Sequence, residues 1–150
     1  MPDTGENRVS YLEDRLAIND LFVRYTTALD RGDVETLVDC FTPDGSLDSP
    51  AVGRHTGHAA IRAFAERFAR FHQGGAQLRH VISNLAVEID GERATATCYL
   101  LNVLTRDGKS RLLAPGRYEC EVVKKHDAWR FSRRVVFHDH DYTLEGIKSA

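Results

Sequence analysis

The sequence contains little of what marks a protein of membranes, of secretion or of nucleic acids. No window of its 150 residues approaches the ~20 consecutive apolar residues that a membrane-spanning helix requires. The first eight residues, MPDTGENR, lack the apolar stretch of a secretory signal. The formal net charge is −2, whereas a nucleic-acid-binding face needs an excess of basic residues. We therefore expect a cytoplasmic protein whose partner is neither a membrane nor a nucleic acid.

Cysteine is scarce, and the motifs of several cofactor sites are missing. Cys40, Cys98 and Cys120 are odd in number, far apart and form no CxxC pair, which predicts buried, reduced thiols. The chain has no GxxxxGK phosphate loop and no GxSxG nucleophile motif. The segment HDHD contains His138 and His140, which would share one face of a strand, but no third zinc ligand is placed beside them. We expect no metal and no cofactor.

The chain length fits one domain with a helical beginning. We expect a flexible tail at residues 1–8, a single domain at residues 9–142 and a second tail at residues 143–150. From Ser10, a candidate N-cap, the spacing of apolar residues predicts a helix that runs to about Arg31.

Two further helices are predicted from their cap residues. Asp33 can cap a short helix, VETLVDCF, which we expect to end in a turn at residues 43–45. A short strand or irregular stretch follows at about residues 46–51. A third helix is predicted from about His58 until the glycines that begin at Gly74.

The second half of the chain is rich in Val, Leu, Tyr and Phe and reads as strands separated by turn signals at Asp90-Gly91, Asp107-Gly108 and His126-Asp127. The predicted strands cover residues 78–89, 94–106, 111–125 and 129–139. Helices followed by an antiparallel meander predict an α+β fold, in which helices pack on one side of a curved sheet. The concave face of such a sheet is a natural pocket.

Asp30 is the first candidate for chemistry, because it closes the first helix at an unusual place. On an ideal helix it lies in one row with three apolar residues, Val23, Leu16 and Leu12. Its carboxylate therefore points either to solvent or into the interior. A negative charge at a helix C-terminus is mildly unfavourable, which favours a functional reason for it. Tyr25 lies about 140° away around the helix, and the pattern alone indicates a core aromatic.

His80 is the second candidate, near the start of a predicted strand. Strict alternation would place it on the face of Ile82 and Asn84, opposite Leu85 and Val87. A lone histidine on a strand is more often structural. Paired with a buried carboxylate, however, an imidazole has a fixed tautomer and can act as a general base.

Three stretches of the chain resemble the SnoaL-like group of the nuclear transport factor 2-like superfamily, over about residues 10–139. They are LAINDLFVRYTTALDRGD in the first helix, LRHVISNLAVEIDG at the first long strand and HDAWRFSRRVV at the last. This group includes scytalone dehydratase, bile acid 7α-dehydratase and lindane dehydrochlorinase. The resemblance implies a cystatin-like α+β cone, with three N-terminal helices packed on a curved, mostly antiparallel sheet that encloses a pocket.

The resemblance also implies roles for single residues. Asp30 matches the group's catalytic aspartate, and His80 matches the paired histidine that serves as general base. Tyr25 matches the tyrosine of the bile acid dehydratase and would be a third catalytic residue. Arg134 takes the place of an active-site arginine. Beside Arg134 and Asn102, we expect three aromatic residues to contact the substrate: Phe22, Phe64 and Tyr118.

The function that follows from this resemblance is a cofactor-independent lyase. Dehydratase-type elimination on a small hydrophobic substrate, which we expect to be cyclic, would use Asp30 and His80 as its base. Tyr25 and Leu78 replace a lysine and a cysteine of the dehydrochlorinase, which favours loss of water over loss of halide. An isomerase or cyclase would use the same first step. A non-catalytic ligand-binding or structural subunit, similar to the small subunit of ring-hydroxylating dioxygenases, is the remaining alternative.

Relatives of this fold commonly form dimers or trimers through the sheet, so we expect a homo-oligomer. In one strand Arg117, Glu119 and Glu121 alternate with apolar residues. This alternation predicts a polar outer sheet face that can contact another subunit.

Overall fold

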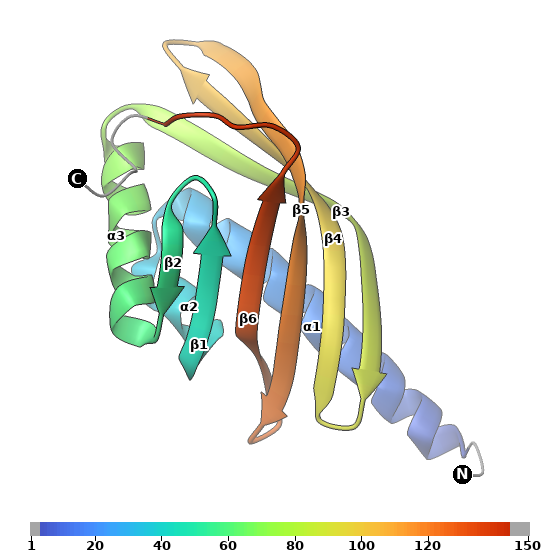
Figure 1. The fold of residues 1–150 in the computed structure, drawn as a ribbon. Helices are drawn as coiled ribbons and strands as arrows, with labels where there is room; N and C mark the ends of the chain where they lie inside the picture. Colours follow the sequence, from blue (N-terminus) through green and yellow to red (C-terminus); the bar gives the residue numbers. More distant parts are fainter. Residues whose placement is uncertain (1–3, 145–150) are drawn as a thin grey trace.

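The chain in this computed structural model begins with helices and ends with a sheet, as the sequence predicts, with one hairpin between the second and third helices (Figure 1). The structure describes residues 4–144, and the outer parts of both expected tails, residues 1–3 and 145–150, lie outside the described residues. Leu144, expected in the second tail, instead packs against the core and is only 7% exposed. The elements are α1 (Gly5–Arg31), α2 (Val34–Asp39), β1 (Phe41–Ser49), β2 (Gly53–Thr56), α3 (His58–Gln73), β3 (Ala76–Asp90), β4 (Arg93–Arg106), β5 (Lys109–Lys125) and β6 (Ala128–His138).

The sheet has six strands in the order β2-β1-β6-β5-β4-β3, and only β1 and β6 pair in parallel. It curves, and α1 crosses behind it (Figure 1). This arrangement confirms the predicted α+β fold. The turns predicted at Asp107-Gly108 and His126-Asp127 are also confirmed, and all four residues have the positive φ angles of tight hairpins. Along residues 4–144, no helix combines the length and the apolarity needed to cross a bilayer.

Helix α1 starts earlier than the sequence analysis placed it. The side chain of Thr4 accepts a hydrogen bond from the Asn7 N–H at 3.3 Å, so Thr4 is the N-cap and the helix begins at Gly5. The prediction that Ser10 caps the helix is therefore wrong, because a suitable cap residue lies more than one turn before it. The predicted end is confirmed: Gly32 has a φ of 71°, which L-residues rarely adopt and glycine tolerates.

The start of α2 was predicted correctly and its end was not. Asp33 accepts a hydrogen bond from the Thr36 N–H at 3.1 Å, as expected of a cap. The turn expected at residues 43–45 lies inside strand β1 instead. Pairing of β1 with β6 is irregular between Phe41 and Ser46, so these residues form an irregularity within a paired strand. The turn composition therefore coincides with an exposed interruption of the pairing inside β1, and the strand continues beyond it.

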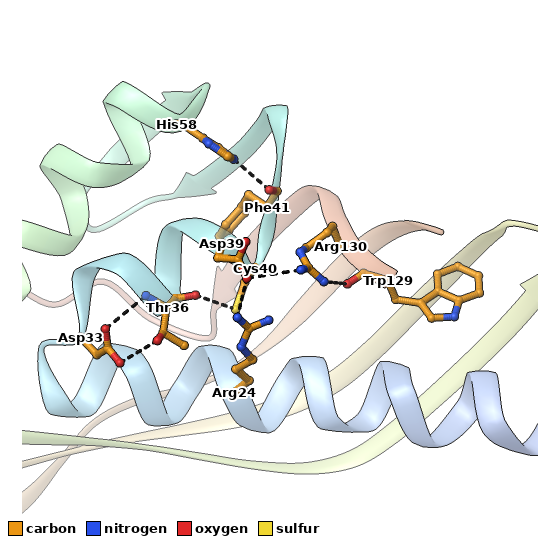
Figure 2. A network of polar contacts seen from close by, with 9 residues as sticks. All are labelled: Arg24, Asp33, Thr36, Asp39, Cys40, Phe41, His58, Trp129 and Arg130. Carbon is orange, nitrogen blue, oxygen red and sulfur yellow. Dashed lines mark hydrogen bonds and ion pairs between the residues drawn. The ribbon is translucent and has the colours of Figure 1, made fainter. Parts of the chain in front are cut away.

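A polar network holds α2 between α1 and β6 (Figure 2). The Asp39 carboxylate accepts hydrogen bonds from Arg24 of α1 at 2.5 Å and from Arg130 of β6 at 3.3 Å. From α3, the His58 ring lies 2.9 Å from the carbonyl oxygen of Phe41. These contacts join three helices and two strands near the C-terminal end of α1, which is where the candidate site begins.

Strand β3 contains a bulge that corrects the predicted alternation of its side chains. Asn84 has a φ of 57°, and the pairing with β4 shifts between Ser83 and Ala86. After the bulge, the side chains that strict alternation would turn outward point inward, and their neighbours point outward. Val87 is buried on the same inner side toward which His80 points, so the prediction that they face opposite sides is wrong.

Candidate functional site

Asp30 and His80 lie together in the interior. The Nδ1 atom of His80 is 2.6 Å from Oδ1 of Asp30, and the backbone N–H of His80 donates to Oδ2 at 3.0 Å. The side chain of Asp30 is 10% exposed and that of His80 is 5% exposed. A carboxylate can only accept, so Nδ1 carries the proton and donates it. In the neutral ring, Nε2 then keeps the lone pair with which a general base works.

The row of α1 that ends in Asp30 is exposed over most of its length. Leu16 is 65% exposed and Val23 is 49% exposed, yet Asp30 in the same row is buried. The difference arises because β3 runs past the last turn of the helix. Gln77 of β3 donates to the Asp30 carbonyl oxygen at 2.8 Å, three residues before His80 bonds the carboxylate. The start of β3 therefore turns a surface position into an interior one.

A small cavity lies beside His80, between α1, α3 and the inner face of the sheet. Its volume is about 30 Å³, and its walls combine aliphatic and aromatic side chains with several polar groups. Such a volume holds a few water molecules at most. The polar or aromatic-polar side chains in the wall are Tyr25, Ser49, His80, Asn102, Tyr118, His138 and Tyr142.

Three of these residues form a chain on the side of the cavity formed by β4, β6 and the C-terminal segment. Asn102 donates through Nδ2 to the Tyr142 hydroxyl at 3.3 Å, and that hydroxyl lies 3.5 Å from Nε2 of His138. Oδ1 of Asn102 and Nδ1 of His138 are buried and have no hydrogen-bond partner among residues 4–144. Burial lowers the pKa of His138. These two unpaired atoms near the cavity can therefore form hydrogen bonds with the polar atoms of a ligand.

Tyr142 is one of three residues that line both the cavity and a neighbouring hollow. The hollow has a volume of about 330 Å³, and it shares the wall residues Ala51, His138 and Tyr142 with the inner cavity. A larger hollow of about 620 Å³ lies near the β4–β5 turn, but neither Asp30 nor His80 lines it. A ligand larger than water can reach His80 from the first hollow if the Tyr142 side chain moves.

Arg134 is fully buried and lies among aromatic rings. Its guanidinium carbon is 3.7 Å from the ring centre of Tyr118, 4.0 Å from that of Tyr25 and 5.1 Å from that of Phe22. Nη1 donates to the Cys120 thiol at 3.4 Å, whereas Nε and Nη2 have no partner. Burial raises the pKa of Tyr25 and of Tyr118, and the charge of Arg134 opposes that rise, so both phenols stay protonated at neutral pH.

Five of the eight residues expected at the site line the cavity and three do not, one of which is Asp30, bonded to the wall residue His80. Tyr25, His80, Asn102, Phe64 and Tyr118 are wall residues. The other expected substrate contacts, Phe22 and Arg134, lie one layer further out, where Arg134 stacks on the two wall tyrosines.

The sequence analysis did not identify Tyr142 or His138 as residues of the cavity wall. His138 was considered only with His140 as a metal ligand, and that pairing is wrong, because β6 ends at His138. His140 is exposed and lies 3.0 Å from the Asp141 carbonyl oxygen. Within residues 4–144, no group of three His, Cys, Asp or Glu side chains is arranged to hold a metal ion. The position of His138 at the end of the last predicted strand is the sequence feature that could have indicated its place in the site.

Fold and site together define a class, the small-molecule-binding proteins of the nuclear transport factor 2-like, cystatin-like fold. Residues 10–135 match the SnoaL-like domain family, and the chain belongs to that family. The uncharacterized protein Rv2910c of Mycobacterium tuberculosis is 29% identical over 136 residues, which cover 85% of this chain and 86% of that protein.

Solved structures agree with this assignment. An NTF2-like protein with a cystatin-like fold from Novosphingobium aromaticivorans is 25% identical with a TM-score of 0.80, and the match covers 97% of this chain and 92% of that chain. A structure from Catenulispora acidiphila in complex with S-DNPA is 26% identical with a TM-score of 0.73 and covers 85% and 95% of the two chains. A neighbour of this fold thus holds a small molecule.

Proposed function

We propose that the protein is a cofactor-independent lyase that removes water from a small hydrophobic, cyclic substrate. The observation that carries this proposal is the 2.6 Å contact between His80 Nδ1 and the Asp30 carboxylate at the wall of an interior cavity. A buried histidine held in this way is equipped to take a proton from carbon, because the carboxylate stabilises the imidazolium that forms.

The proposed reaction uses groups on both sides of the cavity. Nε2 of His80 takes the proton from a carbon next to an activating carbonyl, and Asp30 holds the imidazolium. The carbon–oxygen bond of the neighbouring hydroxyl breaks as Tyr25 donates a proton to the leaving oxygen, which departs as water. His80 then returns its proton to the phenolate through the released water, so that the enzyme is regenerated. Asn102 would stabilise the negative charge that develops on the substrate carbonyl. Arg134 would stabilise the same charge indirectly, through Tyr25 and Tyr118.

Substrate entry in this proposal requires Tyr142 to move. The inner cavity of about 30 Å³ is too small for a ring of six carbons, whereas the adjoining hollow of about 330 Å³ is large enough. Rotation of Tyr142 would join them and bring the substrate to His80. Its contacts to Asn102 and His138, at 3.3 and 3.5 Å, are long and weak, which is consistent with such a movement.

The test is a screen of cyclic β-hydroxy ketones with the wild-type protein and a His80→Gln variant. Elimination is followed by the ultraviolet absorbance of the conjugated ketone and by loss of water in mass spectrometry. We expect His80→Gln to lower turnover by ~10²–10⁴-fold, the usual contribution of a general base. The matched control is His140→Gln, at an exposed histidine outside the cavity. Turnover within a few-fold of wild type in His80→Gln would show that this mechanism is wrong.

The same experiment separates elimination from isomerisation or cyclisation. In D₂O, an isomerase that returns the proton to another carbon incorporates deuterium without losing water, which NMR detects. Either result keeps His80 as the base and changes only the second step.

A non-catalytic role is the second candidate, and the small volume of the interior favours it. A barrel filled by its own side chains suits a structural or assembly subunit. This alternative predicts no turnover on any substrate and co-purification with a larger partner. It also predicts that Asp30 and His80 can be replaced together by residues of similar size without loss of assembly.

We further propose a cytoplasmic homo-oligomer that associates through the outer face of the sheet. Its three thiols are free and buried, as expected in a reducing compartment. Beside the polar face predicted at Arg117, Glu119 and Glu121, this surface also carries exposed apolar side chains. These are Val81, Tyr99, Leu101 and Leu112, at 44–59% exposure. Sedimentation as a monomer at micromolar concentration would contradict this proposal.

A further inference from the structure

Helix α1 has a second apolar stripe that faces away from the core. The stripe consists of Val9, Leu12, Leu16 and Val23, which are 56%, 58%, 65% and 49% exposed; we call it the outer stripe. The buried stripe on the opposite side of the helix includes Ile18 and Phe22, among others, at 0% exposure. Single exposed apolar residues are common on proteins and need no explanation. Four in one row of a helix are a surface that associates with something.

The outer stripe follows a heptad repeat. Val9, Leu16 and Val23 are seven residues apart and take position a, and Leu12 takes position d of the first heptad. Asn19 takes the next d position. An ideal helix places all of these within about 80° of one another. This is the narrow seam of a two-stranded coiled coil, rather than the broader face with which a helix packs on a sheet.

The stripe is accessible in the fold. On the sheet side of α1, Asp14 accepts hydrogen bonds from Lys124 at 3.0 Å and from Trp129 at 2.9 Å, which fixes the opposite side of the helix toward solvent. The first turns of α1 also extend beyond the strands (Figure 1). Helix α2 lies beside α1 from about Arg24 to the C-terminal end of α1, beyond the first two heptads (Figure 2). A partner helix can therefore lie along the first half of α1 without meeting the sheet.

We propose that the partner is a second copy of this chain, whose α1 packs in parallel against the first as a short two-stranded coiled coil. The charges beside the stripe support this choice. In a parallel pair, a residue at position g meets the residue at position e five places further along in the other helix. Arg15 at g then meets Asp20 of the second copy. Arg8 and Glu13 have the same relation one heptad earlier.

The same charges disfavour the antiparallel arrangement. In that arrangement the g side of one helix faces the g side of the other, which brings Arg15 toward arginines. The e sides also face each other, which brings Asp20 toward acidic residues. Like charges at close range cost energy, so the sequence selects the parallel pair.

A seam of little more than two heptads is short for a free peptide, because isolated helices of this length are marginal in water. Here the helix is already formed, since α1 has 27 residues and its later turns pack on the sheet. Association then does not require the helix to form at the same time. The outer sheet face lies on the opposite side of the molecule from the outer stripe. The two contacts can exist together and would build a dimer of dimers.

Disulfide trapping tests the arrangement directly. A Leu12→Cys variant places one thiol at the centre of the seam, where the two copies meet in a parallel pair. The native cysteines do not interfere, because all three are buried. The matched control is Ala17→Cys, which is exposed but lies on a flank of the helix away from the seam. Under mild oxidation we expect Leu12→Cys to form a covalent dimer at least tenfold faster than Ala17→Cys, reversibly with reductant.

Each result decides between arrangements. Equal rates for the two variants, or no covalent dimer, would overturn the proposal. Crosslinking that appears only when Leu12→Cys and Leu16→Cys proteins are mixed would show an antiparallel pair and reject the parallel one. Arg15→Glu in the Leu12→Cys background should slow crosslinking several-fold, and mixing it with an Asp20→Arg version should restore it. Crosslinking must survive a Tyr99→Glu change on the sheet face, since its loss there would mean that the α1 contact is not a separate interface.

Discussion

Replacing Arg134 with methionine should stabilise the protein. Arg134 is 0% exposed, and in the part of the chain that the structure describes its guanidinium meets aromatic rings and the Cys120 thiol rather than a carboxylate. Replacing buried charges by well-packed apolar side chains of similar volume is often neutral or stabilising. Arg134→Met removes the charge and leaves an unbranched apolar side chain of similar volume, two atoms shorter.

The magnitude follows from the contacts of the guanidinium. Nε and Nη2 have no partner, and each unpaired buried donor costs about 1–3 kcal/mol. Contacts with Tyr25 and Tyr118 offset part of this, because a desolvated cation–π contact contributes about 2 kcal/mol. Methionine regains about 0.3–1.5 kcal/mol through sulfur–aromatic contact. We expect the free energy of unfolding to rise by about 2 kcal/mol, which corresponds to an increase of about 4–8 °C in Tm for a protein of this size.

Urea unfolding followed by tryptophan fluorescence measures this change, with Arg133→Met as the matched control. Arg133 is exposed on the opposite face of the same strand, so its replacement should alter stability by less than about 0.5 kcal/mol. If Arg134→Met instead destabilises the protein by more than 1 kcal/mol relative to this control, the ring contacts outweigh the cost of the buried charge. The reasoning that Arg134 is retained for function would then be refuted.

Three further predictions concern the site itself. Asp30→Asn should lower the rate of any proton-abstraction reaction by at least ~10²-fold while the protein stays folded, which circular dichroism and turnover measured together would establish. Tyr142→Ala should admit a hydrophobic fluorescent probe to the interior and increase its affinity, and an unchanged affinity would argue against entry beside Tyr142. Burial lowers the pKa of His55, His72 and His138 below the ordinary value of 6.5. The unfolded chain then binds more protons just below pH 6.5, so the free energy of unfolding should fall as pH is lowered through that range. His138→Asn should flatten the fall, and a stability that rises on acidification would contradict the assignment.

The features that the sequence predicted correctly are those determined by neighbours in the chain. Gly32 ends α1 because glycine tolerates its φ of 71°, and Asp33 caps α2 through its own Thr36 N–H. Both depend on a few consecutive residues. The alternating pattern of the later strands likewise depends only on which side chains face the core.

The features that the sequence did not predict depend on distant pairing. Residues 43–45 have turn composition but lie within β1, at the irregularity where the pairing with β6 skips from Phe41 to Ser46. Asn84 bulges out of β3, which inverts the alternation after it and turns Val87 inward. Asp30 shares its helical row with exposed residues, and only the approach of β3 buries it. None of these effects is encoded by local spacing.

The distribution of unpaired polar atoms distinguishes the two candidate functions. A structural subunit with a filled interior gains nothing from a buried guanidinium without a carboxylate, or from unpaired atoms of Asn102 and His138 beside a cavity. Each of these costs stability, and proteins commonly retain such costs where a site must bind or react. Asn102 and His138 line the cavity together with His80, and Arg134 stacks on two of its wall residues. Among the described residues, His55, Arg67 and His72 also have unpaired buried atoms but do not line the cavity, so only Asn102, His138 and Arg134 bear on the choice between the two functions. His80 and Asn102 are cross-strand partners on β3 and β4, whereas His138 lies two strands beyond Asn102 on β6. A ligand with one polar end beside His80 and Asn102 and a second polar atom near His138 would satisfy these groups, which is compatible with the hydroxy ketone of the lyase proposal.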